Sequence, residues 1–123
     1  MTKEVLVTIS GIQFTDEPDG EPIEMITSGS YYKKNGKHYI LFEELMEGVD
    51  EPVKNTVKLG EESFDITKRG GTSVHLQFEK GKDNLTYYYT PYGSILVGTK
   101  TRGVQIEETE QNLHVQVEYA LEV

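Results

Sequence analysis

Apolar and polar residues alternate along most of this chain, and a period of two is typical of strands that bury one face. In "SVHLQFE", Val74, Leu76 and Phe78 fall on one face, while the polar residues fall on the other. The same alternation recurs near both ends of the sequence, in "EVLVTIS" and "LHVQVEYALEV". The pattern predicts an all-β protein.

Turn-forming residues separate the alternating segments. Asn35-Gly36 is the strongest hairpin signal, because both residues tolerate a positive φ. Together with glycines at later breaks, it divides the chain into nine predicted strands. These cover residues 3–14, 21–34, 37–46, 53–60, 62–69, 72–80, 84–90, 93–107 and 111–123. The segment "LFEELMEGV" also fits a helical stripe, so a short helical turn near Glu44 stays open.

Many consecutive strands joined by short turns indicate an antiparallel meander, and a sheet this wide must curl or close to protect its edges. Strand 93–107 would span about 50 Å if it were straight, so it must bend. Gly29, Gly98 and Gly103 lie inside the long strands, where kinks and bulges are expected. We therefore expect a single domain over residues 1–123, built as an antiparallel barrel of about eight to nine strands or as a strongly coiled sheet.

A cluster of tyrosines, "YYYTPYG" at residues 87–93, is the most conspicuous local feature. Leu85, Tyr87 and Tyr89 share one strand face, and Leu85 indicates that this face points inward. The Thr90–Gly93 segment suits a type I turn that contains Tyr92. The tyrosines are therefore expected to divide among an inner face, an outer face and a turn.

Inward tyrosine hydroxyls need hydrogen-bond partners. A barrel of about eight strands either fills its interior with side chains or holds one small ligand there. The aromatic residues predicted to line this interior, as ligand contacts or as core, are Tyr31, Phe42, Tyr87 and Tyr89.

Three segments in order resemble the YwiB-like family of small bacterial proteins over nearly the whole chain. They are "SGSYYKKNGKHYILFEE" at 28–44, "RGGTSVHLQFEKG" at 69–81 and "YYYTPYGSILVGTKT" at 87–101. The resemblance implies a calycin-like, lipocalin-like β-barrel, a cytoplasmic location and no enzymatic activity. Arg69 matches the family pattern without a known ligand role. It is out of phase with Phe64 and Ile66, so we expect it to point outward and treat it as a residue of the barrel rim.

Composition and charge narrow the function classes. The formal net charge of −9 repels a phosphate backbone, which argues against nucleic-acid binding. The chain has no Cys, and no apolar run reaches the length of a membrane span. The three histidines come from separate predicted strands, so we expect no metal site, and no phosphate loop or nucleophile elbow suggests a cofactor or a hydrolase.

Three functional hypotheses follow from the predicted barrel. The first is a non-enzymatic protein that binds a small, partly apolar ligand in its interior. The second is a solid-core interaction module that acts through a protein partner or a homodimer. The third, an enzyme, ranks last because it needs polar residues from distant strands to converge in a cleft.

Overall fold

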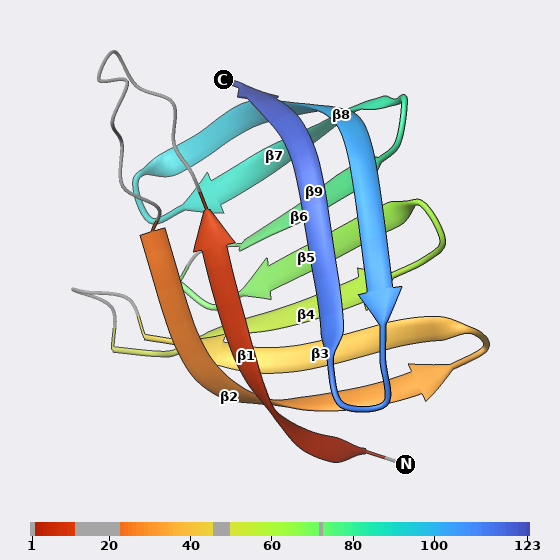
Figure 1. Cartoon of the computed structure of the whole chain (residues 1–123). Coiled ribbons are helices and arrows are strands. Elements are labelled where there is room, and N and C mark those ends of the chain that lie inside the picture. Colours follow the sequence, from red (N-terminus) through yellow and green to blue (C-terminus); the bar gives the residue numbers. More distant parts are fainter. Residues whose placement is uncertain (1, 12–22, 46–49, 72) are drawn as a thin grey trace.

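The computed structural model describes residues 2–11, 23–45, 50–71 and 73–123, with the backbone alone at residues 11, 23 and 24. Within these ranges, nine antiparallel strands follow one another across a single sheet (Figure 1). They are β1 (Lys3–Gly11), β2 (Ile23–Lys34), β3 (Lys37–Glu44), β4 (Val53–Leu59), β5 (Ser63–Arg69), β6 (Ser73–Glu79), β7 (Asp83–Thr90), β8 (Gly93–Glu108) and β9 (Leu113–Glu122).

The predicted strands and meander are confirmed. Where a strand end lies among the described residues, it agrees with the prediction within two residues. The Asn35-Gly36 hairpin is also confirmed, with φ values of 53° and 75° at these two residues. β3 continues to Glu44, so the alternative helical turn does not form between Leu41 and Glu44. The rest of that segment, residues 46–49, lies outside the described part.

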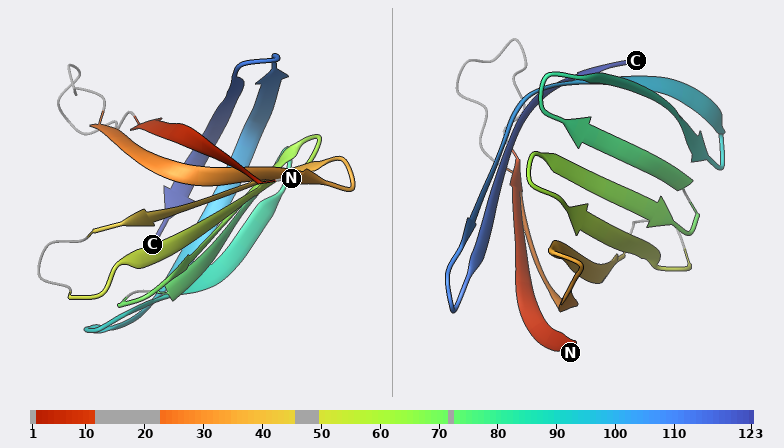
Figure 2. Two further views of the ribbon diagram at one scale, coloured as in Figure 1. Left: turned by 90° about the horizontal axis from the view of Figure 1, so that it is seen from below. Right: turned by 90° about the vertical axis from the view of Figure 1, so that its right-hand side faces the viewer.

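The sheet curls into a half-barrel. Beyond a bulge at Arg102, between Thr101 and Gly103, the second half of β8 turns over the inner face of the sheet and carries β9 with it. Figure 2 shows this β8–β9 hairpin beside β1, facing the middle strands. Within the described ranges, β1 and β9 are not paired, so packing rather than a continuous hydrogen-bond ladder brings the two ends of the sheet together.

The core lies between these two walls. Phe42, Val57 and Leu59 are at most 5% exposed and form its centre. Partly buried residues from six strands surround them: Val7, Met25, Ile40, Phe64, Ile66, Ile106, Leu113 and Val115. Burying a large apolar side chain contributes about 1.5–3 kcal/mol, so this cluster is the main source of stability in the curl. The inner face around Phe42 is thus filled by side chains.

The two faces of β7 are the reverse of the prediction. Ser73 pairs with Tyr89, and Ser73 alternates with Val74, which is 3% exposed on the inner face. Tyr89 therefore points outward, together with Tyr87 and Leu85, and these three residues are 56%, 53% and 75% exposed. The prediction that Tyr87 and Tyr89 line the interior is wrong. It rested on the burial of Leu85, and Leu85 is itself exposed.

Candidate functional site

The hairpin formed by β6 and β7 is open along most of its length. Among the described residues, its strands pair only at Ser73 and Tyr89. Further along, side chains replace the missing ladder: the Gln77 carbonyl accepts hydrogen bonds from Asn84 Nδ2 (3.4 Å) and Thr99 Oγ1 (2.8 Å). These contacts place Gln77 O on the side of β6 that faces β7. Between the paired end and Gln77, the sheet has a seam.

A groove of about 440 Å³ lies over this seam on the outer face. Its lining comes from β5, β6 and β7: Thr67, Arg69, Ser73, Val74, His75, Leu85, Thr86, Tyr87 and Tyr89. Val74 and Thr86 belong to the inner face by strand alternation, yet both reach the groove. The groove therefore follows the seam, and it is widely open to solvent.

The register places a cation and an aromatic ring at opposite sides of the groove. Arg69 pairs with Ser73, and Ser73 pairs with Tyr89, so the three residues form one row across the strands. Tyr87 extends the aromatic side, with its ring centroid 6.3 Å from that of Tyr89. Lys54 flanks Arg69 as its partner on β4. Among the described residues, no carboxylate lies within 4.0 Å of the Arg69 guanidinium.

His75 occupies the middle of the groove. Its Nε2 lies 3.3 Å from Asp65 Oδ1, and its side chain is 49% exposed. Ser73 lies two residues away on the same face, so serine, histidine and aspartate share one surface. Among the described hydrogen bonds, however, none joins Ser73 to His75. The three side chains therefore do not form the hydrogen-bonded chain that a nucleophilic triad requires.

The structure divides the predicted site residues into two groups. Arg69, Tyr87 and Tyr89 line the outer groove, and Arg69 points outward as expected. Tyr31 and Phe42 lie on the inner face. Phe42 is a core residue and does not contact the groove, so the five residues do not form one site.

Tyr31 belongs to a polar cluster that links two hairpins. Its hydroxyl is 2.7 Å from His38 Nδ1. Glu108, at the end of β8, lies 3.2 Å from Lys33 Nζ and 3.9 Å from His38 Nε2. Burial raises the pKa of the Tyr31 hydroxyl, and the Glu108 charge adds to this, while Lys33 acts in the opposite direction. This cluster holds the β8–β9 hairpin against the β2–β3 hairpin.

Sequence reasoning missed Thr67, Ser73 and His75 as groove residues. Thr67 lies on the same face of β5 as Arg69, and Ser73 and His75 are the register partners of these two residues on β6. This arrangement becomes visible only when the register of β5 and β6 is known. The histidines do not converge: His38 faces inward, whereas His75 and His114 face outward on separate strands. No group of three potential metal ligands occurs in the described part of the chain.

The groups in the groove are suited to binding. A guanidinium offers a planar fork of donors that matches a carboxylate or phosphate. Tyrosine rings offer flat apolar surfaces with a polar edge. An arginine that has no carboxylate partner among the described residues, opposite two exposed tyrosines, thus fits a ligand with an anionic group and a flat apolar part.

Comparison with known proteins places this fold in a family. A sequence profile described as "Domain of unknown function (DUF1934)" matches residues 7–123. The chain belongs to the DUF1934 family. This DUF1934 chain is 27% identical, over 125 residues, to the "Uncharacterized beta-barrel protein YwiB" of Bacillus subtilis (strain 168), covering 100% of this chain and 86% of the relative. The predicted resemblance is confirmed.

A solved structure supports the fold of this DUF1934 protein. The crystal structure of the ywiB protein from Bacillus subtilis superposes with a TM-score of 0.88 at 22% identity. The match covers 98% of this chain and 83% of that chain. The family and its relative are described as being of unknown function and uncharacterized, so the groove itself must carry the functional argument. In the described part of the chain, no helix is both long and apolar enough to cross a membrane.

Proposed function

We propose that this protein binds a small molecule, without catalysing a reaction, in the outer groove over β5–β7. The observation that carries the proposal is the convergence of Arg69, Tyr87 and Tyr89 on one groove of about 440 Å³. Ligand sites commonly occupy about 300–1,000 Å³, so the groove has room for a small metabolite. A cytoplasmic location, implied by the family resemblance, forms part of the same proposal.

The proposed ligand carries a carboxylate or phosphate and a flat, partly apolar group. The anionic group contacts Arg69, which has no carboxylate partner in the described structure. The flat group lies along Tyr87 and Tyr89 and enters the seam beside Val74 and Thr86. The filled core around Phe42 favours this outer position over the interior expected from the sequence.

Binding without turnover agrees with the chemistry of the groove. Ser73 and His75 share a face, but no described hydrogen bond joins one to the other. The His75 side chain is half exposed to water. A nucleophile needs a positioned base and a site protected from solvent. The groove groups instead supply contact surface and a fixed charge.

Native mass spectrometry of gently purified protein tests the proposal. A bound small molecule should appear in the wild type and be lost in Tyr87→Ala. Tyr92→Ala is the matched control, because Tyr92 is 99% exposed in the β7–β8 turn and does not line the groove. Arg69→Gln should weaken binding of the same molecule, while Arg102→Gln, on the bulge of β8, should not. Retention of the adduct by all four variants would contradict the proposal.

A second function, self-association, is favoured by a separate observation. Leu6 and Ile26 are 73% and 63% exposed on the outer face of β1 and β2. Thr8 pairs with Ile26, so Leu6 and Ile26 are diagonal neighbours on adjacent strands. This apolar pair lies on β1 and β2, and β1 is at one end of the strand order. Light scattering after size exclusion should then give a dimer mass that falls to the monomer mass in Leu6→Glu; a monomer at all concentrations would exclude it.

A further inference from the structure

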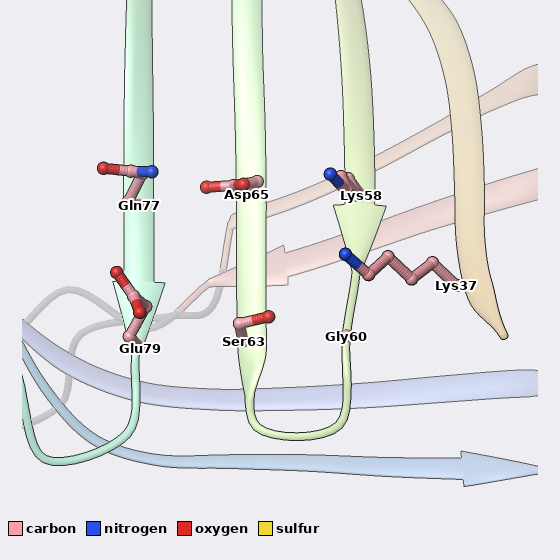
Figure 3. A pocket seen from close by; sticks show the side chains of 7 residues that line it. All are labelled: Lys37, Lys58, Gly60, Ser63, Asp65, Gln77 and Glu79. Atoms are coloured by element: carbon pink, nitrogen blue, oxygen red, sulfur yellow. The ribbon is translucent and has the colours of Figure 1, made fainter. Parts of the chain in front are cut away.

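A second hollow lies on the outer face, at the ends of β3–β6 near the β4–β5 turn. Its volume is about 160 Å³, and its lining consists of Lys37, Lys58, Gly60, Ser63, Asp65, Gln77 and Glu79. Figure 3 shows these side chains rising from neighbouring strands around the turn. Apart from Lys37, all of them are half-buried, so the hollow is partly shielded from water.

Charges of opposite sign occupy opposite sides of this hollow. Lys37 and Lys58 come from β3 and β4, and Asp65 and Glu79 come from β5 and β6 (Figure 3). Lys58 is the register partner of Asp65, but the two side chains do not pair. Asp65 instead lies 3.3 Å from His75 Nε2, and Glu79 lies 3.3 Å from Lys82 Nζ.

The two lysines consequently have unused binding capacity. Within the described part of the chain, neither Lys37 nor Lys58 has a carboxylate within 4.0 Å. The Lys58 ammonium has one described aromatic contact, at 6.0 Å from the ring centroid of Tyr39. A half-buried Lys58 and an exposed Lys37 beside one hollow together attract a carboxylate more strongly than an isolated surface lysine does.

The β4–β5 turn contributes the Ser63 hydroxyl to the hollow, and Gly60 contributes no side chain that would cover it. A Cβ placed on Gly60 would lie 2.6 Å from Ser63 Oγ, so glycine is what leaves the Ser63 hydroxyl accessible. The Gly60 amide donates to the Ser63 carbonyl at 3.1 Å, which fixes the position of Ser63. The Ser63 hydroxyl makes no described hydrogen bond of its own and stands on the same side as the hollow.

We propose that this hollow binds a small zwitterion, such as a free α-amino acid. The carboxylate of the ligand contacts Lys37, Lys58 and the Ser63 hydroxyl, and its ammonium group contacts Asp65 and Glu79. A simple anion fits less well, because two carboxylates line the far side and the whole protein carries a net charge of −9. Since one water takes up about 30 Å³ of the liquid, the hollow has room for a ligand about the size of a small amino acid.

The test is a titration followed by amide chemical shifts in ¹H–¹⁵N NMR spectra. Glycine and β-alanine are the zwitterionic probes, and acetate and methylammonium each supply one of the two charges. We expect saturable shifts at Gly60, Ser63 and Gln77 with dissociation constants on the order of millimolar for at least one zwitterion. The single-charge ions should bind about tenfold more weakly or not saturate.

Two variants complete the test. Lys58→Gln should weaken zwitterion binding about tenfold, whereas Lys100→Gln, on the outer face of β8, should leave it unchanged. Equal binding of acetate and the zwitterions, absence of saturable shifts, or equal effects of both variants would overturn the proposal. The result is independent of the β5–β7 groove, because neither lysine lines that groove.

Discussion

Gly29→Ala should strongly destabilise the fold, because the sheet has no space for a side chain at this position. A Cβ on Gly29 would lie 2.7 Å from the carbonyl oxygen of Leu41 and 2.9 Å from Val7 Cγ2. Leu41 is held in the β3 ladder between β2 and β4, so its carbonyl cannot move without disturbing both pairings. Overpacking in a core typically costs about 1–3 kcal/mol, and contact with backbone places this case near the upper end, at about 2–3 kcal/mol.

Urea unfolding and thermal melting, followed by far-ultraviolet circular dichroism, measure this effect. A loss of about 2–3 kcal/mol should lower Tm by roughly 6–15 °C in a chain of this size. Gly103→Ala is the matched control, because a Cβ there meets nothing within 4 Å and its φ is not left-handed. We expect the control to range from no change to about 1 kcal/mol of stabilisation. Equal stability of the two variants would refute the packing of β1 and β3 against Gly29.

Three further predictions concern other parts of the inner face. Burial raises the pKa of the Glu44 carboxyl, but hydrogen bonds from Lys68 and Asn55 and the Lys68 charge outweigh burial and lower this pKa below its ordinary value. A pKa that is lowered in the folded state gives stability that is lost as pH falls through that pKa. The stability difference between wild type and Glu44→Gln should therefore shrink on acidification, and a constant difference would contradict the pairing. Tyr31→Phe should cost about 1 kcal/mol by leaving His38 Nδ1 without its partner, and should remove one tyrosine with a raised pKa from an alkaline absorbance titration; an unchanged upper end of the titration would argue against the raised pKa. Leu59→Ala should cost about 2–5 kcal/mol in urea unfolding, since Leu59 is fully buried, and a cost below about 1 kcal/mol would contradict the core assignment.

The strand order was predictable from the sequence because turn chemistry and alternation are local signals. Asn35-Gly36 fixed one hairpin, and the bends inferred at Gly29 and Gly103 correspond to a tight backbone approach and to a β-bulge. The number and length of the strands predicted that the sheet curls, and the family resemblance implied a barrel as well. Each of these features depends on a few neighbouring residues, which a single sequence shows directly.

The orientation of β7 was not predictable, since both of its faces carry aromatic residues. Alternation separates Tyr87 and Tyr89 from Tyr88 but does not say which set faces inward. The inner side of this strand includes the polar residues Asn84 and Thr86, and Asn84 Nδ2 donates a hydrogen bond to the Gln77 carbonyl of β6. The seam arises because the described parts of β6 and β7 pair at Ser73 and Tyr89 and not further along, and alternation does not show where a ladder stops. For the same reason, the meeting of Arg69 with Tyr89 could not be inferred from the chain alone.

An NMR titration with 2-naphthoate tests the proposed groove most directly, because this probe combines a carboxylate with a flat ring. We expect saturable shifts at the amides of Arg69, His75 and Tyr87, and these shifts should weaken strongly in Arg69→Gln. Cyclohexanecarboxylate and 2-naphthylmethanol, which each lack one of the two features, should bind more weakly. Shifts centred on the inner-face amides of Phe42 and Val57, or no saturable shift at the groove, would contradict the central claim that this protein binds its ligand on the outer face.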